Sequence, residues 1–225
     1  KILAISVDEG IPDDIIPGEP CPTLMDAITL MFPEGQNAMD LHPYLFEEGV
    51  TLNVTVEEET DVYVKFIREG AGWKNTFGYY AYPADNLPSS IEELEKFVVF
   101  PNASMVGNGG GLKPGDMVQL GNAPFPANTV IGFYLLAQGW ANGQMVEGIY
   151  THYTNISFNE NNNQQHLLFI ENGCEDLVLT FEDILLPGGD KDFNDIILVI
   201  KDNDEDFPNT KFNVEGIITL SEDNM

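Results

Sequence analysis

Residues 181–200, FEDILLPGGDKDFNDIILVI, combine two apolar runs with a short acidic segment between them. The first run ends at Glu182 and Asp183, and a Pro187-Gly188-Gly189 turn follows. The second run covers residues 196–200 and has the composition of a buried β-strand. The sequence therefore predicts two strands joined by a tight loop that carries hard oxygen ligands, namely Asp190, Asp192, Asn194 and Asp195.

These acidic side chains repel one another unless a cation lies between them. Calcium suits such a loop because it accepts six to eight oxygen ligands in flexible geometry. The two glycines allow the backbone to fold back and bring Asp190 near the end of the first strand. We therefore predict a calcium site; the alternative is a solvated acidic turn. Successive strand residues point to opposite faces, so the side chains of Glu182 and Asp183 are expected to diverge. The predicted ligands are Glu182, Asp183, Asp190, Asp192, Asn194 and Asp195.

The loop is not an EF-hand, although its first three ligands share the spacing of one. Asp195 stands where an EF-hand loop has its glycine, and Lys201 stands where the closing glutamate belongs. Strand-like runs, not helices, flank the loop. A hairpin or another strand-connecting loop is the better interpretation.

This stretch resembles the closing motif of the domain of unknown function 4114, which occurs in LruC-type secreted bacterial proteins. The similarity runs from about Phe32 to Ile200. It implies an extracellular, all-β, calcium-associated module of a cell-surface or adhesin-like protein, and it implies no reaction. The other matching segments are EGAGWKNTFGYY at 69–80, FPNAS at 100–104, GGGL at 109–112, GFYLLAQGW at 132–140, His166 and FED at 181–183.

Composition limits the partners that the chain can have. The 225 residues carry 37 acidic and 9 basic side chains, a formal net charge of −28. Such a charge opposes binding to nucleic acid or anionic lipid and attracts divalent cations. No apolar run approaches the roughly 20 residues that span a membrane, so direct membrane insertion is not expected. Residues 1–7 are too short for a signal peptide, and a leader removed earlier would leave no trace.

Many short strand-like runs separated by Gly, Pro and Asn turns predict an all-β fold, an antiparallel β-sandwich of the jelly-roll kind with one or two short helices. Residues 1–25 are expected to form an N-terminal strand and a Pro-rich acidic segment, and residues 26–225 a single sandwich domain with the family core at about 100–200. Two domains divided near Phe100 are the alternative. Strands are predicted at 1–7, 50–56, 61–68, 76–82, 97–100, 117–120, 129–138, 148–153, 165–171, 177–184, 196–201 and 212–220.

Three local predictions depend on short patterns. Residues 23–32 fit a helix or a strand equally well. Residues 88–96 are the clearest helix, because Ser90 and Glu93 have the spacing of a capping box. The run Glu57 to Thr60, which carries three glutamates, is expected to form a hairpin-like turn between two strands. The second of these strands, at 61–68, alternates like a half-buried one.

Aromatic residues are densest at 73–82. Alternation places Phe77 and Tyr79 in the core. Trp73 and Trp140 stand beside glycine-rich turns at strand ends, where loops often carry function. They are our candidates for contact with a ligand, because aromatic faces stack on sugar rings; ordinary core packing is the alternative.

Two further sets of residues leave alternatives open. Glu69 and Asn75, or Asp202 and Asp204, could hold a second ion, but such residues more often hydrogen-bond a turn or face solvent. Cys21 and Cys174 lack metal or redox spacing, so they form either a disulfide or two buried thiols.

Catalytic motifs are weak in this sequence. The histidines at 42, 152 and 166 have no zinc-binding spacing, and no serine lies in a Gly-x-Ser-x-Gly elbow. We therefore expect no enzymatic activity. Together with the acidic loop, the resemblance implies a non-catalytic calcium-binding module of a bacterial surface or secreted protein that serves adhesion or glycan binding. The rival hypotheses are a carbohydrate-active enzyme with paired carboxylates and a calcium-stabilised structural spacer. The sequence leaves the glycan and the oligomeric state open.

Overall fold

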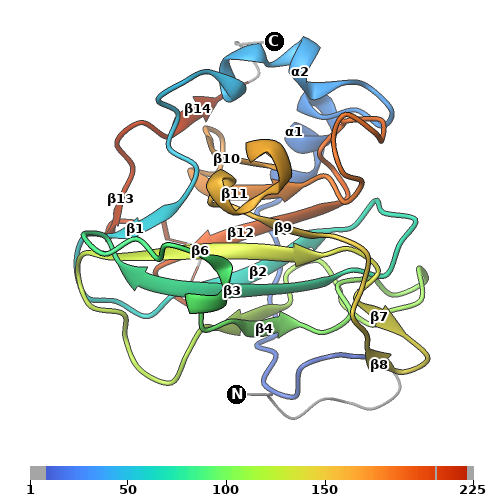
Figure 1. Cartoon of the computed structure of the whole chain (residues 1–225), viewed down its shortest axis with the longest axis horizontal. Helices are drawn as coiled ribbons and strands as arrows, with labels where there is room; N and C mark the ends of the chain where they lie inside the picture. Colours follow the sequence, from blue (N-terminus) through green and yellow to red (C-terminus); the bar gives the residue numbers. More distant parts are fainter. Residues whose placement is uncertain (1–8, 206, 222–225) are drawn as a thin grey trace.

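The computed structural model describes residues 9–205 and 207–221, so the strand predicted at residues 1–7 lies outside the described residues. Within this part of the chain, two six-stranded sheets pack against each other (Figure 1). Nearly all of their strand pairs are antiparallel. The predicted all-β sandwich is therefore confirmed.

The first sheet is organised around its two longest strands, which pair over eight residues. Gly132 lies opposite Tyr80, and a Cβ atom at Gly132 would collide with the tyrosine ring. Glycine therefore lets an aromatic side chain lie flat across the neighbouring strand. The strand order is β13 (Phe212–Asn213), β1 (Val54–Val56), β6 (Thr129–Leu136), β3 (Thr76–Pro83) and β4 (Phe97–Phe100), with β9 (Thr151–Tyr153) also pairing with β6.

The second sheet carries the two strands that the acidic loop joins. Phe181 pairs with Ile196, so residues 182–195 connect adjacent antiparallel strands as predicted. One edge pair, β10 with β14, is parallel. The strand order is β14 (Ile218–Leu220), β10 (His166–Glu171), β11 (Asp176–Phe181), β12 (Ile196–Lys201), β2 (Tyr63–Arg68) and β5 (Met117–Gln119).

The main core fills the space between the sheets. Phe77 stacks on Phe133 with ring centroids 5.6 Å apart, and Phe181 packs edge-on against Phe77. Tyr79 also faces this core, as alternation predicts. A separate tyrosine cluster, including Tyr80 and Tyr153, covers the outer face of the first sheet. Burying each large side chain contributes roughly 1.5–3 kcal/mol, so this layer carries much of the stability.

A helical segment covers the outer face of the second sheet (Figure 1). It consists of α1 (Leu24–Met31), α2 (Ala38–Leu41) and the 3-10 turn η1 (Pro43–Phe46). Within residues 23–32, Leu24–Met31 form a helix because their buried side chains recur at helical spacing. This cover also buries Ile67 on the outward side of β2. The prediction that β2 is half-buried was therefore wrong.

The helix predicted over residues 88–96 is reduced to the single 3-10 turn η2 (Ile91–Glu93). Ser90 makes no capping bond, and the Glu93 carboxylate accepts hydrogen bonds from the N–H and hydroxyl of Ser89 instead. None of the η2 residues is buried. Without an apolar face to pack, a segment this short has little to stabilise a helix.

Two strand connections differ from the prediction. Residues 57–60 do not form a hairpin turn, because β1 and β2 belong to different sheets and the segment crosses between them. The strand predicted at 212–220 divides into β13 and β14, again in different sheets, around a turn at Gly216 with φ +77°. Local alternation predicts a strand but not the sheet that it joins. The remaining elements are the hairpin β7 (Trp140–Ala141) with β8 (Gln144–Met145) and the turns η3 (Ile156–Phe158) and η4 (Glu160–Asn162).

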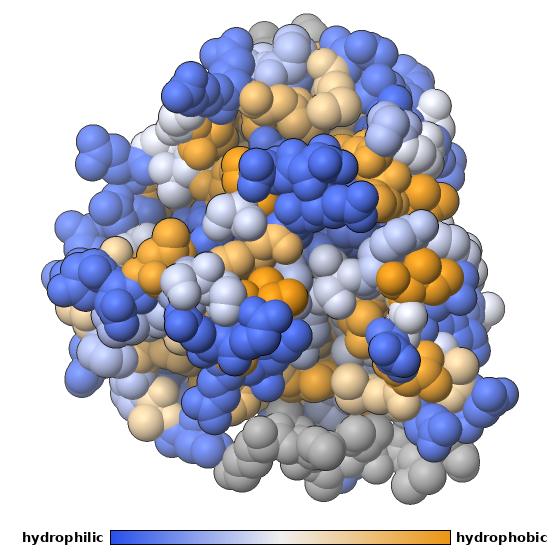
Figure 2. Space-filling model, in the orientation of Figure 1, coloured by the Kyte–Doolittle hydropathy of each residue, from blue (hydrophilic) through white to orange (hydrophobic). Residues whose placement is uncertain are grey.

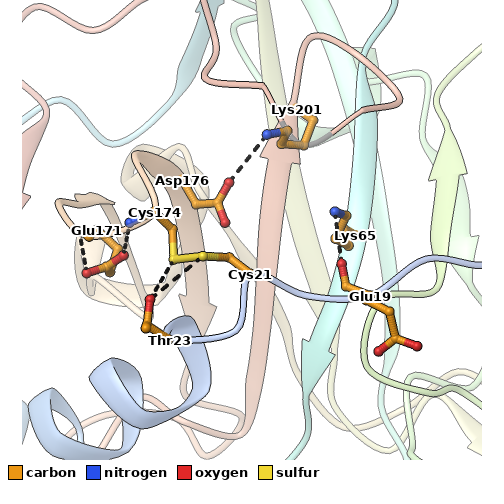
Figure 3. Close-up of a disulfide and its surroundings, with 9 residues drawn as sticks. Glu19, Cys21, Thr23, Lys65, Glu171, Cys174, Asp176 and Lys201 are labelled. Carbon is orange, nitrogen blue, oxygen red and sulfur yellow. Dashed lines mark hydrogen bonds and ion pairs between the residues drawn. A yellow bond between two sulfur atoms is a disulfide. The ribbon is translucent and has the colours of Figure 1, made fainter.

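Cys21 and Cys174 form a disulfide, which settles the alternative left open by the sequence (Figure 3). The bond joins the segment before α1 to the turn between β10 and β11. The Glu171 carboxylate accepts hydrogen bonds from the main-chain N–H groups of Gly173 and Cys174, which fixes that turn. Farther back along the chain, Ile16 forms a bridge to Met117 at the edge of the second sheet.

The surface is strongly polar. Figure 2 shows hydrophilic side chains over much of one face, with hydrophobic residues in separate patches between them. Among the described residues, no helix has the length and apolar character needed to cross a membrane.

Candidate metal centre

Three carboxylates meet where β11 and β12 join the acidic loop. The main-chain N–H of Asp183 donates a 2.7 Å hydrogen bond to Oδ2 of Asp195. One carboxylate oxygen from each of Glu182, Asp183 and Asp195 lies within 4.8 Å of the others. We call these three residues the inner group. The expected divergence of Glu182 and Asp183 was wrong, because β11 ends at Phe181 and its pleat does not continue.

The loop is fixed by a buried aromatic anchor. Phe193 is fully buried in the core beneath the helical segment and packs edge-on against Phe46 at 5.3 Å. Lys191 and Phe193 both have positive φ, which turns the backbone sharply on either side of Asp192. A Cβ atom at Gly189 would collide with Oε1 of Glu182. The glycine therefore allows the loop to close over the inner group.

A second set of carboxylates lies at the mouth of the site. Oxygens of Glu34, Asp190 and Asp192 lie within 4.8 Å of one another, and we call these residues the outer group. Glu34 follows α1 and was not among the predicted ligands. The Gly35 N–H donates a 2.8 Å hydrogen bond to Oδ2 of Asp192, which positions this segment. No sequence motif links Glu34 to a loop more than 150 residues away.

Both groups line one pocket of about 230 Å³. Trp73 and Gly70 form part of its wall. The amide of Asn194 lies beside Gly70, and its nitrogen donates to the Phe32 carbonyl at 3.4 Å. The fold thus brings all six predicted ligands to one pocket and adds Glu34. The predicted ligands in its lining are Glu182, Asp183, Asp190, Asp192, Asn194 and Asp195.

The inner carboxylates are held in an environment that disfavours their charge. Burial, followed by the charge of Asp183, raises the pKa of Asp195 to about 9. Burial and the charges of Asp190, Asp192 and Asp183 raise the pKa of Glu182 to about 8. Glu182 is 1% exposed, and its Oε2 atom has no hydrogen-bond partner. A buried carboxylate oxygen without a donor is costly, and a cation would satisfy it.

Neighbouring polar groups orient Asp183. The Asn75 side-chain amide donates to Oδ2 of Asp183 at 2.8 Å, and Nε2 of His152 bonds the Asp183 carbonyl at 2.9 Å. Burial and, to a smaller extent, the charge of Asp183 raise the pKa of Glu69. The Asn108 side-chain amide donates a hydrogen bond to the Glu69 carboxylate. Glu69 and Asn75, proposed for a second ion, therefore adjoin this same pocket.

Asp202 and Asp204 are not part of the pocket lining. The Asp202 carboxylate accepts 2.6 Å hydrogen bonds from the N–H groups of Thr210 and Lys211, so it stabilises the turn that leads to β13. Among the described residues, the inner and outer groups are the two sets of Asp, Glu, His or Cys side chains in which three ligand atoms lie close enough together to hold one metal ion.

Trp73 and Trp140, the predicted ligand contacts, line a second hollow of about 450 Å³. Trp140 is only 6% exposed, and its ring lies against Gly10. Trp73 is half-buried and lines both this hollow and the carboxylate pocket. The sequence indicated both tryptophans but not that Trp73 lies between the two sites.

Residues 125–215 match the family model described as Domain of unknown function (DUF4114). The match contains residues 182–195 and begins after Glu34 and Trp73. It starts later, and ends farther along, than the similarity inferred from the sequence. Comparisons with curated proteins and with solved structures found no match.

Proposed function

We propose that this protein is a non-catalytic calcium-binding module whose ion is held by the inner group and closed in by the outer group. The unpartnered, buried Oε2 atom of Glu182 is the observation that carries this proposal. A cation in the pocket would compensate the repulsion among Glu182, Asp183 and Asp195 and would allow them to be ionised at neutral pH.

The donor set favours calcium over other divalent ions. Every side-chain atom in the pocket lining that could coordinate a metal ion is a carboxylate or amide oxygen, and such ligands suit a hard cation. The ligands come from three separate segments, at Glu34, at the end of β11 and in the loop. Calcium tolerates such irregular, high-coordination sites, whereas magnesium requires near-ideal octahedral geometry.

The ion would have a structural role. Glu34 belongs to the helical segment, whereas the other carboxylates belong to the β11–β12 connection. An ion bound by both groups would therefore fasten the helical segment to the second sheet. Bound calcium would also reduce the self-repulsion of a chain with net charge −28.

The proposed setting is the outside of a bacterial cell or its envelope, where the module would serve adhesion or glycan binding. The Cys21–Cys174 disulfide supports this setting, because disulfides persist in oxidising compartments (Figure 3). The acidic composition also suits an environment in which calcium is plentiful.

The test combines calorimetric titration with thermal melts. Protein stripped of metal by chelation is titrated with calcium and, in parallel, with magnesium. An ion that binds only the folded state at a hundred times its dissociation constant stabilises it by about 2.7 kcal/mol. We expect a clear increase in Tm with calcium, a much smaller one with magnesium, and loss of calcium binding in a Glu182→Gln plus Asp195→Asn variant.

A matched variant controls for the change in net charge. Glu57→Gln plus Glu58→Gln likewise removes two acidic side chains, but from exposed positions outside the pocket. We expect this variant to bind calcium like the parent protein. Equal calcium affinity in the pocket variant and in the parent would overturn the site assignment.

A further inference from the structure

The hollow beside Trp73 has the composition of a binding site rather than of a packing defect. Its volume of about 450 Å³ lies within the roughly 300–1,000 Å³ of small-molecule pockets. Apolar surface from Ile149, which is 52% exposed, meets polar groups from Lys74, Gln138 and Glu147. Apolar surface is thus combined with a few polar groups that can orient a ligand.

A chain of hydrogen bonds connects this hollow to the carboxylate pocket. The Asn75 amide nitrogen donates to Oδ2 of Asp183 at 2.8 Å, and its amide oxygen accepts from the N–H of Gln138 at 3.0 Å. Gln138 has φ +54°, a conformation uncommon for a residue with a side chain. Asn75 therefore links the backbone of the hollow at Gln138 to the carboxylate of Asp183.

Trp73 forms a second connection. Together with Gly72 it lines both the hollow and the carboxylate pocket, so its position depends on the geometry of both. Next to it, the Lys74 carbonyl accepts a 3.1 Å hydrogen bond from the N–H of Trp140. This bond joins two segments of the hollow's lining at the residue that follows Trp73 in the chain.

We propose that the hollow binds a neutral saccharide, and binds it tightly only when the carboxylate pocket holds its cation, an inference that rests on the proposed function. An indole face stacks against the C–H face of a pyranose ring, and amide, ammonium and carboxylate groups bond its hydroxyls. Lys74 and Glu147 are of opposite charge, so the polar rim carries no net charge. The strongly acidic chain would repel an anionic sugar.

The cation acts on the hollow through Asp183. A bound ion would fix this carboxylate in place, so that Asn75 and Gln138 keep their orientation. Without the ion, repulsion within the inner group would displace Asp183 and loosen both connections to the hollow. The cation thus adds affinity by preorganising the hollow and not by touching the sugar.

The experiment applies the protein to an array of neutral glucans, mannans, galactans and N-acetylhexosamine polymers, with uronic-acid polymers for comparison, in calcium and in chelator. The tightest neutral oligosaccharide is then titrated calorimetrically. We expect binding in calcium and at least a tenfold loss of affinity in chelator. Trp73→Ala should also lower the affinity at least tenfold, whereas Trp73→Phe should retain part of it.

Two controls separate this inference from the calcium proposal. Phe207→Ala removes an aromatic side chain that is 63% exposed outside the hollow, and it should leave saccharide affinity unchanged. Calcium affinity is measured separately on every variant, because Trp73 also lines the carboxylate pocket. Glu147→Gln changes a residue that lines only the hollow, and it should lower saccharide affinity while keeping calcium affinity. Calcium-loaded protein that binds no neutral saccharide would overturn the inference and leave the cation site intact. A saccharide affinity that falls less than tenfold in chelator, or in Trp73→Ala, would also overturn it.

Discussion

The hydrogen bond from the Asp183 N–H to Oδ2 of Asp195 holds two carboxylate-bearing residues together at the ends of adjacent strands. The strand pairing of Phe181 with Ile196 keeps the backbones of Asp183 and Asp195 close together, so their repulsion can be relieved only by movement of the side chains. Fold stability is therefore opposed by the charge of the inner group when no cation compensates it. This opposition gives the site properties that can be measured without knowing its ligand.

Neutralising Glu182 should stabilise the metal-free protein and abolish its response to calcium. Glu182→Gln keeps the shape of the side chain but removes a charge that burial disfavours, as the pKa of about 8 indicates. At pH 8 we expect the free energy of unfolding in chelator to rise by roughly 2–4 kcal/mol, since each pKa unit corresponds to about 1.4 kcal/mol. Urea unfolding with and without calcium measures both effects. A variant that is less stable than the parent in chelator would contradict the repulsion argument.

The stability of the metal-free protein should fall as the pH rises from about 6.5 to 9. The raised pKa values of Glu182 and Asp195 mean that the folded state binds more protons than the unfolded state in this range, so stability decreases with pH. Calcium should remove much of this slope, and its stabilising effect should be larger at pH 8 than at pH 6.5. Urea unfolding at several pH values measures the slope. The Glu182→Gln variant should show a shallower slope than the parent in chelator.

The sequence predicted the acidic loop because its ligands are adjacent in the chain, and it could not predict the partners that come from elsewhere. Glu34 reaches the pocket through the packing of the helical segment against the second sheet, which no local pattern encodes. Asn75 was predicted only as a ligand of a separate ion, and the packing of the two sheets brings it to Asp183 instead. The same limit applies to the strands. Apolar runs and, for β2, alternation identified the segments that form β1, β2 and β12, but residues 57–60 cross between sheets because of tertiary pairing. The capping spacing at Ser90 did not produce a helix because no apolar face supports it.

The disulfide should contribute substantially to stability without affecting the cation pocket. Cys21 and Cys174 are 153 residues apart, so their bond closes a long loop in the unfolded chain. Closing such a loop is worth about 2–5 kcal/mol. The Cys21→Ser plus Cys174→Ser variant should lose about this much in guanidinium unfolding while binding calcium normally, because neither residue lines the pocket. A change in calcium affinity larger than threefold would show that the helical segment depends on this bond for its position.

Buried His166 should make the protein less stable at acid pH. Its Nε2 donates to the Leu52 carbonyl at 3.1 Å, and burial lowers its pKa to about 4. The unfolded state binds a proton below about pH 6.5 that the folded state does not, so stability present above pH 6.5 is lost as the pH falls towards 4. The full loss is on the order of 3 kcal/mol. Comparing the parent with His166→Gln across this range isolates the contribution, and parallel stability profiles for the two proteins would refute it.

Glu34 should determine whether calcium fastens the helical segment to the sheet. Its side chain is exposed, so Glu34→Gln should leave the fold intact. Because Glu34 supplies one carboxylate of the outer group, calcium affinity should fall threefold to tenfold, up to about 1.4 kcal/mol. Hydrogen exchange of residues 35–46 gives a more specific readout: calcium should slow it in the parent and much less in the variant, while exchange in the β11–β12 loop stays slowed in both. Glu48→Gln removes an exposed charge after η1 and serves as the control. If calcium protects residues 35–46 equally in Glu34→Gln and in the parent, the ion is held by the β11–β12 connection alone.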